Sequence, residues 1–130
     1  MTTSERRAIW LKYDKHCAYC GKLIELKDMQ VDHLLPKHLA YWIRNYEISH
    51  KYNLPKDIND FENLMPACRR CNYYKGGERL ESFRRKIKTL HKRLMEQYLD
   101  KVALDYGIIT INTWDCKFYF EQHGTTQGSQ

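Results

Sequence analysis

Four cysteines form two pairs with the spacing of a metal-binding turn. Cys17 and Cys20 are separated by two residues, as are Cys68 and Cys71. Each pair places two thiolates on one tight turn, and four thiolates suit a tetrahedral Zn²⁺ ion. Because such a site has no open coordination position, its expected role is structural. The pattern therefore predicts a zinc site that ties the two turns together.

Other residues capable of chemistry lie between these pairs or directly after them. Asp32 and His33 are adjacent in the stretch VDHLLPKH, Asn63 precedes the second cysteine pair, and Asn72 directly follows it. Taken singly, each has an ordinary structural explanation: a turn former, a satisfied histidine, a helix cap, the end of a metal-binding turn. Their order around a predicted zinc site favours a shared role.

The combined pattern is C-x2-C, then D-H-x-x-P, then N-L-x-P-x-C-x-x-C-N-x-x-K. It resembles the HNH endonucleases, whose core is a ββα-metal fold, and the resemblance covers about Cys17 to Gly77. The family often has histidine at its last motif position, where this chain has Asn72, a variation that other members share. The expected fold is accordingly α+β, an HNH core held by a zinc site of four cysteines.

The resemblance implies a role for each residue. His33 would be the general base that takes a proton from the attacking water. Asp32 and Asn72 would hold one divalent ion, Mg²⁺ or Mn²⁺, and Asn63 would brace the loop that carries His33. The residue types suit these roles, because a neutral imidazole is an available base near pH 7 and carboxylate and amide oxygens are hard ligands.

Asp32 and His33 pose a geometric problem, because adjacent side chains on a regular strand point to opposite faces. Both can serve one site only where the strand becomes irregular. Pro36 and the brace from Asn63 are the expected causes of such a bend. We therefore expect Asp32 to face the ion with Asn72, and His33 to face the attacking water from the strand's end.

The chain has a formal net charge of +6 and a pI near 9.1. Basic residues gather between Arg69 and Arg93, where only Glu78 and Glu81 oppose them. This block indicates a polyanionic partner, although a solvated helix face is an equally good interpretation. The expected nucleic-acid contacts are Lys75, Arg69, Arg70, Arg84 and Arg85.

The core is expected to contain short elements. A first helix capped by Ser4 would turn Trp10 and Leu11 to its apolar side. Residues 23–31 could form two short strands, and residues 61–65 an extended stretch. The spacing of apolar residues predicts a helix over 37–52, which we expect to pack on the core rather than to act as a specificity or dimer element. His38 could approach the substrate, but a surface histidine is the simpler interpretation.

Beyond the core, the sequence predicts one long amphipathic helix from Glu78 to about Tyr106, ended by Gly107. Its apolar stripe could pair with a second subunit in a homodimer. Residues 108–113 and 117–121 would form a short hairpin containing Cys116 as a packed thiol. We expect a single HNH domain, with its core at about 16–77, a helical and hairpin extension at 78–122 and a disordered tail at 123–130.

No apolar run approaches the roughly 18 residues that span a bilayer, and the N-terminus is not a secretory signal. We therefore expect no membrane partner and a cytoplasmic protein of bacterial or phage type.

The leading hypothesis is an HNH endonuclease acting on DNA, with structural zinc and catalytic Mg²⁺ or Mn²⁺. One alternative is a zinc-stabilised nucleic-acid-binding module without catalysis, which would not need Asp32, His33 and Asn72 together. Another is an RNA-directed nuclease, which no residue excludes.

Overall fold

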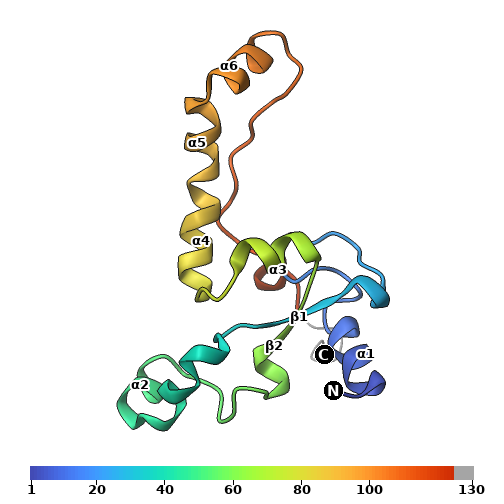
Figure 1. Ribbon diagram of the computed structural model, residues 1–130, viewed down its shortest axis with the longest axis vertical. Helices are drawn as coiled ribbons and strands as arrows, with labels where there is room; N and C mark the ends of the chain where they lie inside the picture. Colours follow the sequence, from blue (N-terminus) through green and yellow to red (C-terminus); the bar gives the residue numbers. More distant parts are fainter. Residues whose placement is uncertain (125–130) are drawn as a thin grey trace. The chain divides into compact units, whose positions relative to one another are not determined.

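The computed structural model describes residues 1–124, so most of the predicted disordered tail lies outside the described residues. The fold is α+β, as expected, with a two-stranded antiparallel sheet among helices (Figure 1). The chain divides into two compact units: Met1–Leu80 together with the chain from Phe118, and Glu81–Lys117. We call the second of these the helical unit. In residues 1–124, no helix has the length and apolar character needed to cross a membrane.

The first helix, α1 (Thr3–Leu11), begins two residues earlier than a Ser4 cap would allow. Thr2 is the N-cap, and its side chain and that of Glu5 form a capping box. The residue that α1 buries is Ile9, which packs with Met29 and Leu64, whereas Trp10 covers this cluster only in part. The predicted apolar side is thus confirmed at Trp10, whereas Ile9, the buried residue of the helix, was missed.

A buried lysine ties the end of α1 to the sheet. Lys12 is 4% exposed, and its Nζ donates to the carbonyl oxygens of Phe61 at 2.6 Å and Leu64 at 2.8 Å. Burial lowers the pKa of this amine to about 8. The two carbonyls satisfy the ammonium, so Lys12 acts as a polar cross-link between segments far apart in the sequence.

Only one of the two strands predicted in residues 23–31 forms. His16 and Leu23 make a single bridge, a short 3₁₀ turn η1 (Leu26–Asp28) follows, and β1 spans Gln30–His33. In the turn between His16 and Leu23, Gly21 has φ of +82°, and a Cβ there would lie 2.5 Å from the Tyr119 ring. Only glycine fits a turn with that backbone and so close a neighbour.

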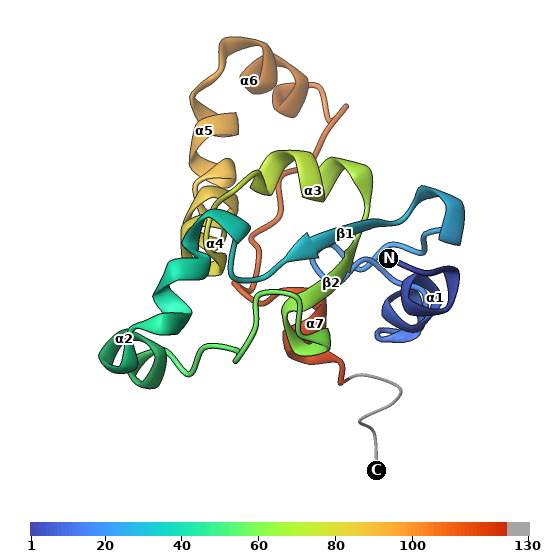
Figure 2. The ribbon, with the colours of Figure 1, turned by 60° about the horizontal axis from the view of Figure 1, so that its bottom comes forward.

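β1 pairs antiparallel with β2 (Leu64–Ala67), and α3 (Arg69–Lys75) follows β2 after Cys68. In register, Asp32 lies opposite Met65 and His33 lies opposite Leu64. α3 packs against β1 (Figure 2). The extended stretch predicted from residue 61 begins later, because η3 (Phe61–Asn63) is a 3₁₀ turn.

The helix predicted over 37–52 is two helices. η2 (Lys37–Arg44) is a 3₁₀ helix and α2 (Tyr46–Lys51) is an α-helix, with Asn45 between them in extended backbone. Asn45 accepts a hydrogen bond from the Ile48 amide, because an asparagine caps a new helix better than it continues an old one. Neither helix buries a residue, so the expectation that this segment packs on the core is wrong.

The prediction of one long helix in the basic block is also wrong. The structure has three helices there: α4 (Leu80–Lys88), α5 (Leu90–Glu96) and α6 (Tyr98–Asp105). The Lys86 carbonyl accepts from the Thr89 hydroxyl and from Arg93 Nη2, which substitute for a regular helical partner at the first break. At the second break Gln97 has ψ of 129°, an extended backbone.

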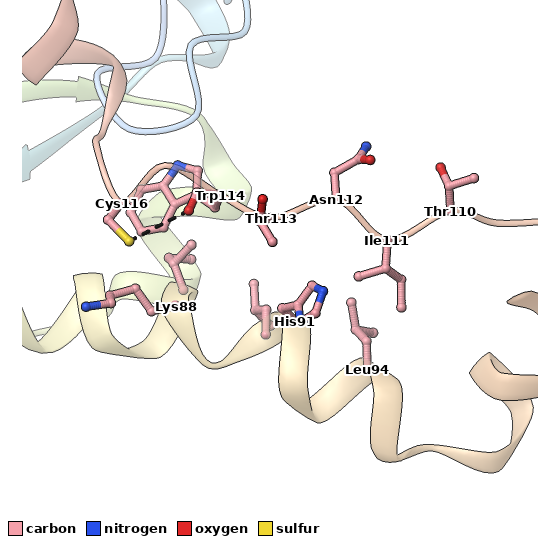
Figure 3. A pocket seen from close by; sticks show the side chains of 11 residues that line it. Lys88, His91, Leu94, Thr110, Ile111, Asn112, Thr113, Trp114 and Cys116 are labelled. Carbon is pink, nitrogen blue, oxygen red and sulfur yellow. Dashed lines mark hydrogen bonds between the residues drawn. The ribbon is translucent and has the colours of Figure 1, made fainter.

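The predicted hairpin does not form either. In the helical unit, residues 110–116 run without regular structure past α4 and α5 and line a groove of about 510 Å³ (Figure 3). Ile87, Leu90 and Leu94 line the same groove, so part of the apolar stripe faces this chain's own segment. Cys116 is only half-buried, with φ of +68°, and its carbonyl accepts from Arg84 Nη1 at 2.6 Å.

The chain then returns to the first unit as a helix, α7 (Tyr119–Gln122), in place of the second predicted strand. The backbone amides of Tyr119 and Phe120 donate to the carbonyls of Tyr19 and Ala18. Phe118 is 2% exposed and meets the Tyr19 ring edge-on at 5.5 Å. α7 therefore covers the turn that carries the first cysteine pair.

Candidate functional site

The four predicted zinc ligands lie together. The sulfur atoms of Cys17, Cys20, Cys68 and Cys71 are all within 4.8 Å of one another, and Cys20 Sγ lies 3.9 Å from Cys68 Sγ. Zn–S bonds of about 2.3 Å in a tetrahedron place sulfurs about 3.8 Å apart, so this cluster fits zinc. Hydrogen bonds with Cys17 and Cys71 lower the pKa of Cys20 and so favour its thiolate.

Asp32 lies in the middle of β1, and its carboxylate is 6% exposed. Its Oδ2 accepts from the hydroxyl of Tyr19 and from Lys75 Nζ at 3.0 Å. Burial, and then the charge of Asp32, raise the pKa of Tyr19 well above its usual value, so the phenol stays protonated and donates. The carboxylate thus links the turn bearing the first cysteine pair to α3.

Lys75 differs from the prediction. It is fully buried, pairs with Asp32 and donates to the His33 carbonyl at 3.1 Å. Its ammonium is therefore turned inward, away from the surface where a phosphate would bind. Lys75 instead fixes the end of β1 from the last turn of α3. Asn72, the other predicted ion ligand, is half-buried on the same helix, which packs against β1.

His33 ends β1 and is half-exposed. Its Nε2 lies 2.9 Å from Oδ1 of Asn59. An amide oxygen only accepts, so Nε2 carries a proton, and the lone pair of the neutral ring is then on Nδ1. That is the tautomer a general base needs.

The sequence reasoning missed Asn59. It sits in a loop closed by its neighbours, because the Asn59 amide donates to Asp57 Oδ1 at 2.8 Å and the Asp57 amide donates to Asp60 Oδ2 at 3.1 Å. The run of Asp and Asn from 57 to 60 was an available signal, since these residues favour such turns.

Asn63 contacts the loop that follows His33. Its Oδ1 accepts from the Leu35 amide at 2.7 Å, and its Nδ2 donates to the carbonyls of Leu35 at 3.1 Å and Ile58 at 2.8 Å. The Leu34 amide donates to the Asn63 carbonyl. These bonds take the place of strand pairing beyond His33. The backbone is therefore irregular after His33, where we predicted a bend.

Asp32 and His33 line one pocket of about 310 Å³, although they are adjacent on a strand. The other lining residues are Val31, Pro36, Lys37, His38, Gly76 and Gly77. His38 is therefore placed at the same site, where the sequence favoured an ordinary surface position. Two histidines and an aspartate are among the lining residues, and imidazole and carboxylate groups are suited to acid–base chemistry and to binding a cation.

The predicted nucleic-acid contacts are dispersed. Arg69 and Arg70 are exposed and line a shallow hollow of about 890 Å³ with Lys22, Lys27 and Tyr73. In the helical unit, Arg84 is held by Glu81 at 3.0 Å and by the Cys116 carbonyl. Arg85 is exposed and reaches Ser82 Oγ at 3.3 Å. Arg69, Arg70 and Arg85 are thus the accessible members of the set.

The family model of the HNH endonucleases matches residues 17–78. This part of the chain is an HNH domain. The match begins at Cys17 and includes both cysteine pairs, Asp32 and His33, as the resemblance in the sequence implied. Comparisons with the curated proteins and with the solved structures find no match.

Proposed function

We propose that this protein is a metal-dependent endonuclease that hydrolyses phosphodiester bonds in DNA. The observation that carries the proposal is the pocket of the HNH domain, which is lined by Asp32 and by His33, the candidate base. The exposed Arg69 and Arg70 and the net charge of +6 support a polyanionic substrate. Because the four zinc-binding thiols must stay reduced, the proposed compartment is the cytoplasm.

In the proposed reaction, Nδ1 of His33 takes a proton from a water as its oxygen attacks the phosphorus. Asn59 holds the imidazole through Nε2, and Asn63 holds the loop that sets its orientation. Asp32 and Asn72 would hold Mg²⁺ or Mn²⁺, which stabilises the charge on the phosphate and the departing 3′ oxygen. The products are a 5′-phosphate and a 3′-hydroxyl.

The second candidate is a nucleic-acid-binding module without catalysis. The buried ion pair between Lys75 and Asp32 favours it, because the ammonium already neutralises the carboxylate that a cation would need. Under the nuclease proposal, the same ion pair makes the divalent-ion site weak.

The test is a cleavage assay with zinc-loaded protein, supercoiled plasmid, linear duplex and RNA, with and without Mg²⁺ or Mn²⁺. We expect metal-dependent nicking of DNA that falls by about 10²-fold or more in His33→Ala, the loss typical of a missing general base. His91→Ala, a histidine of the helical unit, is the matched control and should cleave like wild type. Equal inertness of wild type and His33→Ala, with both retarding DNA in a gel, would support the binding module.

Asn59→Ala refines the test. If Asn59 positions the imidazole, kcat should fall by about tenfold with KM unchanged, because substrate binding does not use this amide. Asn112→Ala in the helical unit is the control. Equal rates for Asn59→Ala and wild type would remove Asn59 from the proposal.

A further inference from the structure

A cluster of aromatic rings and cations lies in the segment that leaves the pocket. Trp42 and Tyr52 stack at 6.2 Å between ring centroids, and Tyr41 meets Trp42 edge-on at 6.4 Å. Arg79 Cζ lies 5.1 Å from the Trp42 ring centre and 5.4 Å from that of Tyr52. Lys51 Nζ lies 5.4 Å from the Tyr52 ring. We call these five residues the aromatic cluster.

The cluster is on the surface. Tyr41 is 56% exposed and Tyr52 is 46% exposed, and the helices η2 and α2 bury no residue. Such rings add little to the core, so packing does not account for them. Arg79 and Lys51 contact the rings through cation–π interactions, and the two tyrosines still expose about half of their surface to solvent.

The cluster is close in sequence to two residues that line the pocket. Lys37 and His38 line the pocket, and Tyr41 follows His38 by three residues in η2. Gly77 also lines the pocket, and Arg79 follows it by two residues. Consecutive Cα atoms are at most about 3.8 Å apart, so the Tyr41 Cα lies within about 12 Å of the His38 Cα. Figure 2 shows η2 and α2 continuing from the end of β1.

The charge of the segment matches a nucleic acid. Within residues 37–54, Glu47 is the acidic residue, against Lys37, Arg44 and Lys51. Arg79 adds a further cation to the cluster itself. Ring faces interleaved with cations are the combination that binds unpaired bases together with their phosphates, because every base has a face that can stack.

We propose that the aromatic cluster binds an unpaired nucleobase of the substrate strand, next to the phosphate held in the pocket. Tyr41 and Tyr52 stack with the base, and Lys51 and Arg79 compensate the flanking phosphates. Bases within a duplex present their edges and not their faces, so the cluster favours substrates with unpaired bases beside the cut. The inference rests on the proposed nuclease function, whose substrate it specifies.

The experiment measures binding and not cleavage, by fluorescence anisotropy of a labelled single-stranded DNA oligonucleotide and of its duplex. Zinc-loaded protein is used without added Mg²⁺ or Mn²⁺. Tyr41→Ala with Tyr52→Ala should weaken single-strand binding by about tenfold or more, at about 1–3 kcal/mol per stacked base. Duplex binding should change by less than about twofold, because phosphate contacts dominate it.

Two variants control the result. Tyr41→Phe with Tyr52→Phe keeps both rings and should bind the single strand like wild type. Tyr98→Ala removes a tyrosine of the helical unit that is 82% exposed and should also have no effect. All variants should melt at the wild-type temperature, since the altered side chains are exposed. If the double alanine variant melts lower, single Tyr41→Ala replaces it in the test, with a smaller expected loss of single-strand affinity.

Unchanged single-strand affinity in the double alanine variant would overturn the inference. Unchanged affinity with loss of a dimer in sedimentation would instead assign the cluster to a second copy of the chain. The nuclease proposal fails separately: a wild-type protein that cuts no substrate, while the alanine variants lose single-strand binding, would refute catalysis and retain the base-binding cluster. A wild type that cuts DNA, with variants that bind normally, would refute only the cluster.

Discussion

The HNH domain and the helical unit are stabilised by different kinds of contact. In the first unit, buried polar groups connect residues far apart in the sequence, as in the cysteine cluster, the Lys75–Asp32 ion pair and the hydrogen bonds of Asn63. The helical unit relies on apolar contact along α4 and α5 and leaves Tyr98, Leu99 and Ile108 more than three-quarters exposed. Specific cross-links fix one arrangement, whereas a half-covered apolar stripe permits several.

This difference explains why residue types predict the structure of the HNH domain better than that of the helical unit. A thiol, carboxylate or amide buried in the HNH domain needs a particular partner, so its position is constrained by chemistry. Helical periodicity in residues 78–106 carries no such demand and is compatible with one helix or three. The expected effects of substitutions follow the same division.

The largest effect is expected at the cysteine cluster. Cys68→Ser should lose stoichiometric zinc and unfold the HNH domain, because metal binding to such sites supplies on the order of 10 kcal/mol of folding free energy. Zinc content by mass spectrometry and thermal unfolding by circular dichroism measure this. Cys116→Ser, outside the cluster, should keep both zinc and melting temperature. A Cys68→Ser protein that melts like wild type would refute a structural zinc site.

The next effect is expected at the buried ion pair. Lys75→Met leaves the Asp32 carboxylate buried beside Tyr19 without its cation, which typically costs about 3–5 kcal/mol of unfolding free energy. Urea unfolding measures this, with the exposed Lys92→Met as control. A loss below about 1 kcal/mol would mean that Asp32 finds water or another cation as readily as Lys75.

A pair of leucines compares the two regions directly. Leu64→Ala, in β2, removes a side chain that is 6% exposed and should cost about 2–5 kcal/mol. Leu99→Ala, in α6, alters a side chain that is 78% exposed and should change stability by less than about 0.5 kcal/mol. Urea unfolding followed by circular dichroism gives both values. Similar losses for the two variants would show that α6 is covered in solution.

The smallest effect concerns pH. The pKa of Lys12 is lowered to about 8 in the folded chain, so above that pH the unfolded chain binds more protons at this residue. Stability contributed through Lys12 should therefore rise as pH increases from about 8 towards 10. Wild type should gain about 1 kcal/mol over Lys12→Met between pH 8 and 9.5. An unchanged difference between the two proteins across this range would contradict the lowered pKa.

For the HNH domain, the sequence predicted which elements and clusters are present better than it predicted how individual side chains are oriented. The cysteine cluster and the α+β core follow from spacing and motif order, and the backbone does become irregular after His33. Lys75 was misjudged because a lysine is normally exposed, and only the fold shows that Asp32 lies within its reach. Asn59 was missed because its partner, His33, lies 26 positions earlier in the chain.

Beyond Gly77 the predictions fail for a physical reason. The breaks at Thr89 and Gln97 depend on side-chain bonds to single carbonyls and on one extended residue, which periodicity does not encode. The expected strand at 117–121 became α7 because Phe118 finds a buried site against Tyr19, and such tertiary contact overrides strand propensity.

The docking of α7 on the first cysteine turn has a consequence for biosynthesis. All four cysteines of the cluster precede residue 72, whereas Phe118, which packs on Tyr19, is made only after the whole helical unit. At a translation rate of about 5–20 residues per second, the delay between Cys71 and Phe118 is on the order of 2–10 s. A nascent chain can thus capture its metal while the Tyr19 ring still lacks its aromatic cover, and the domain matures in two steps set by the ribosome.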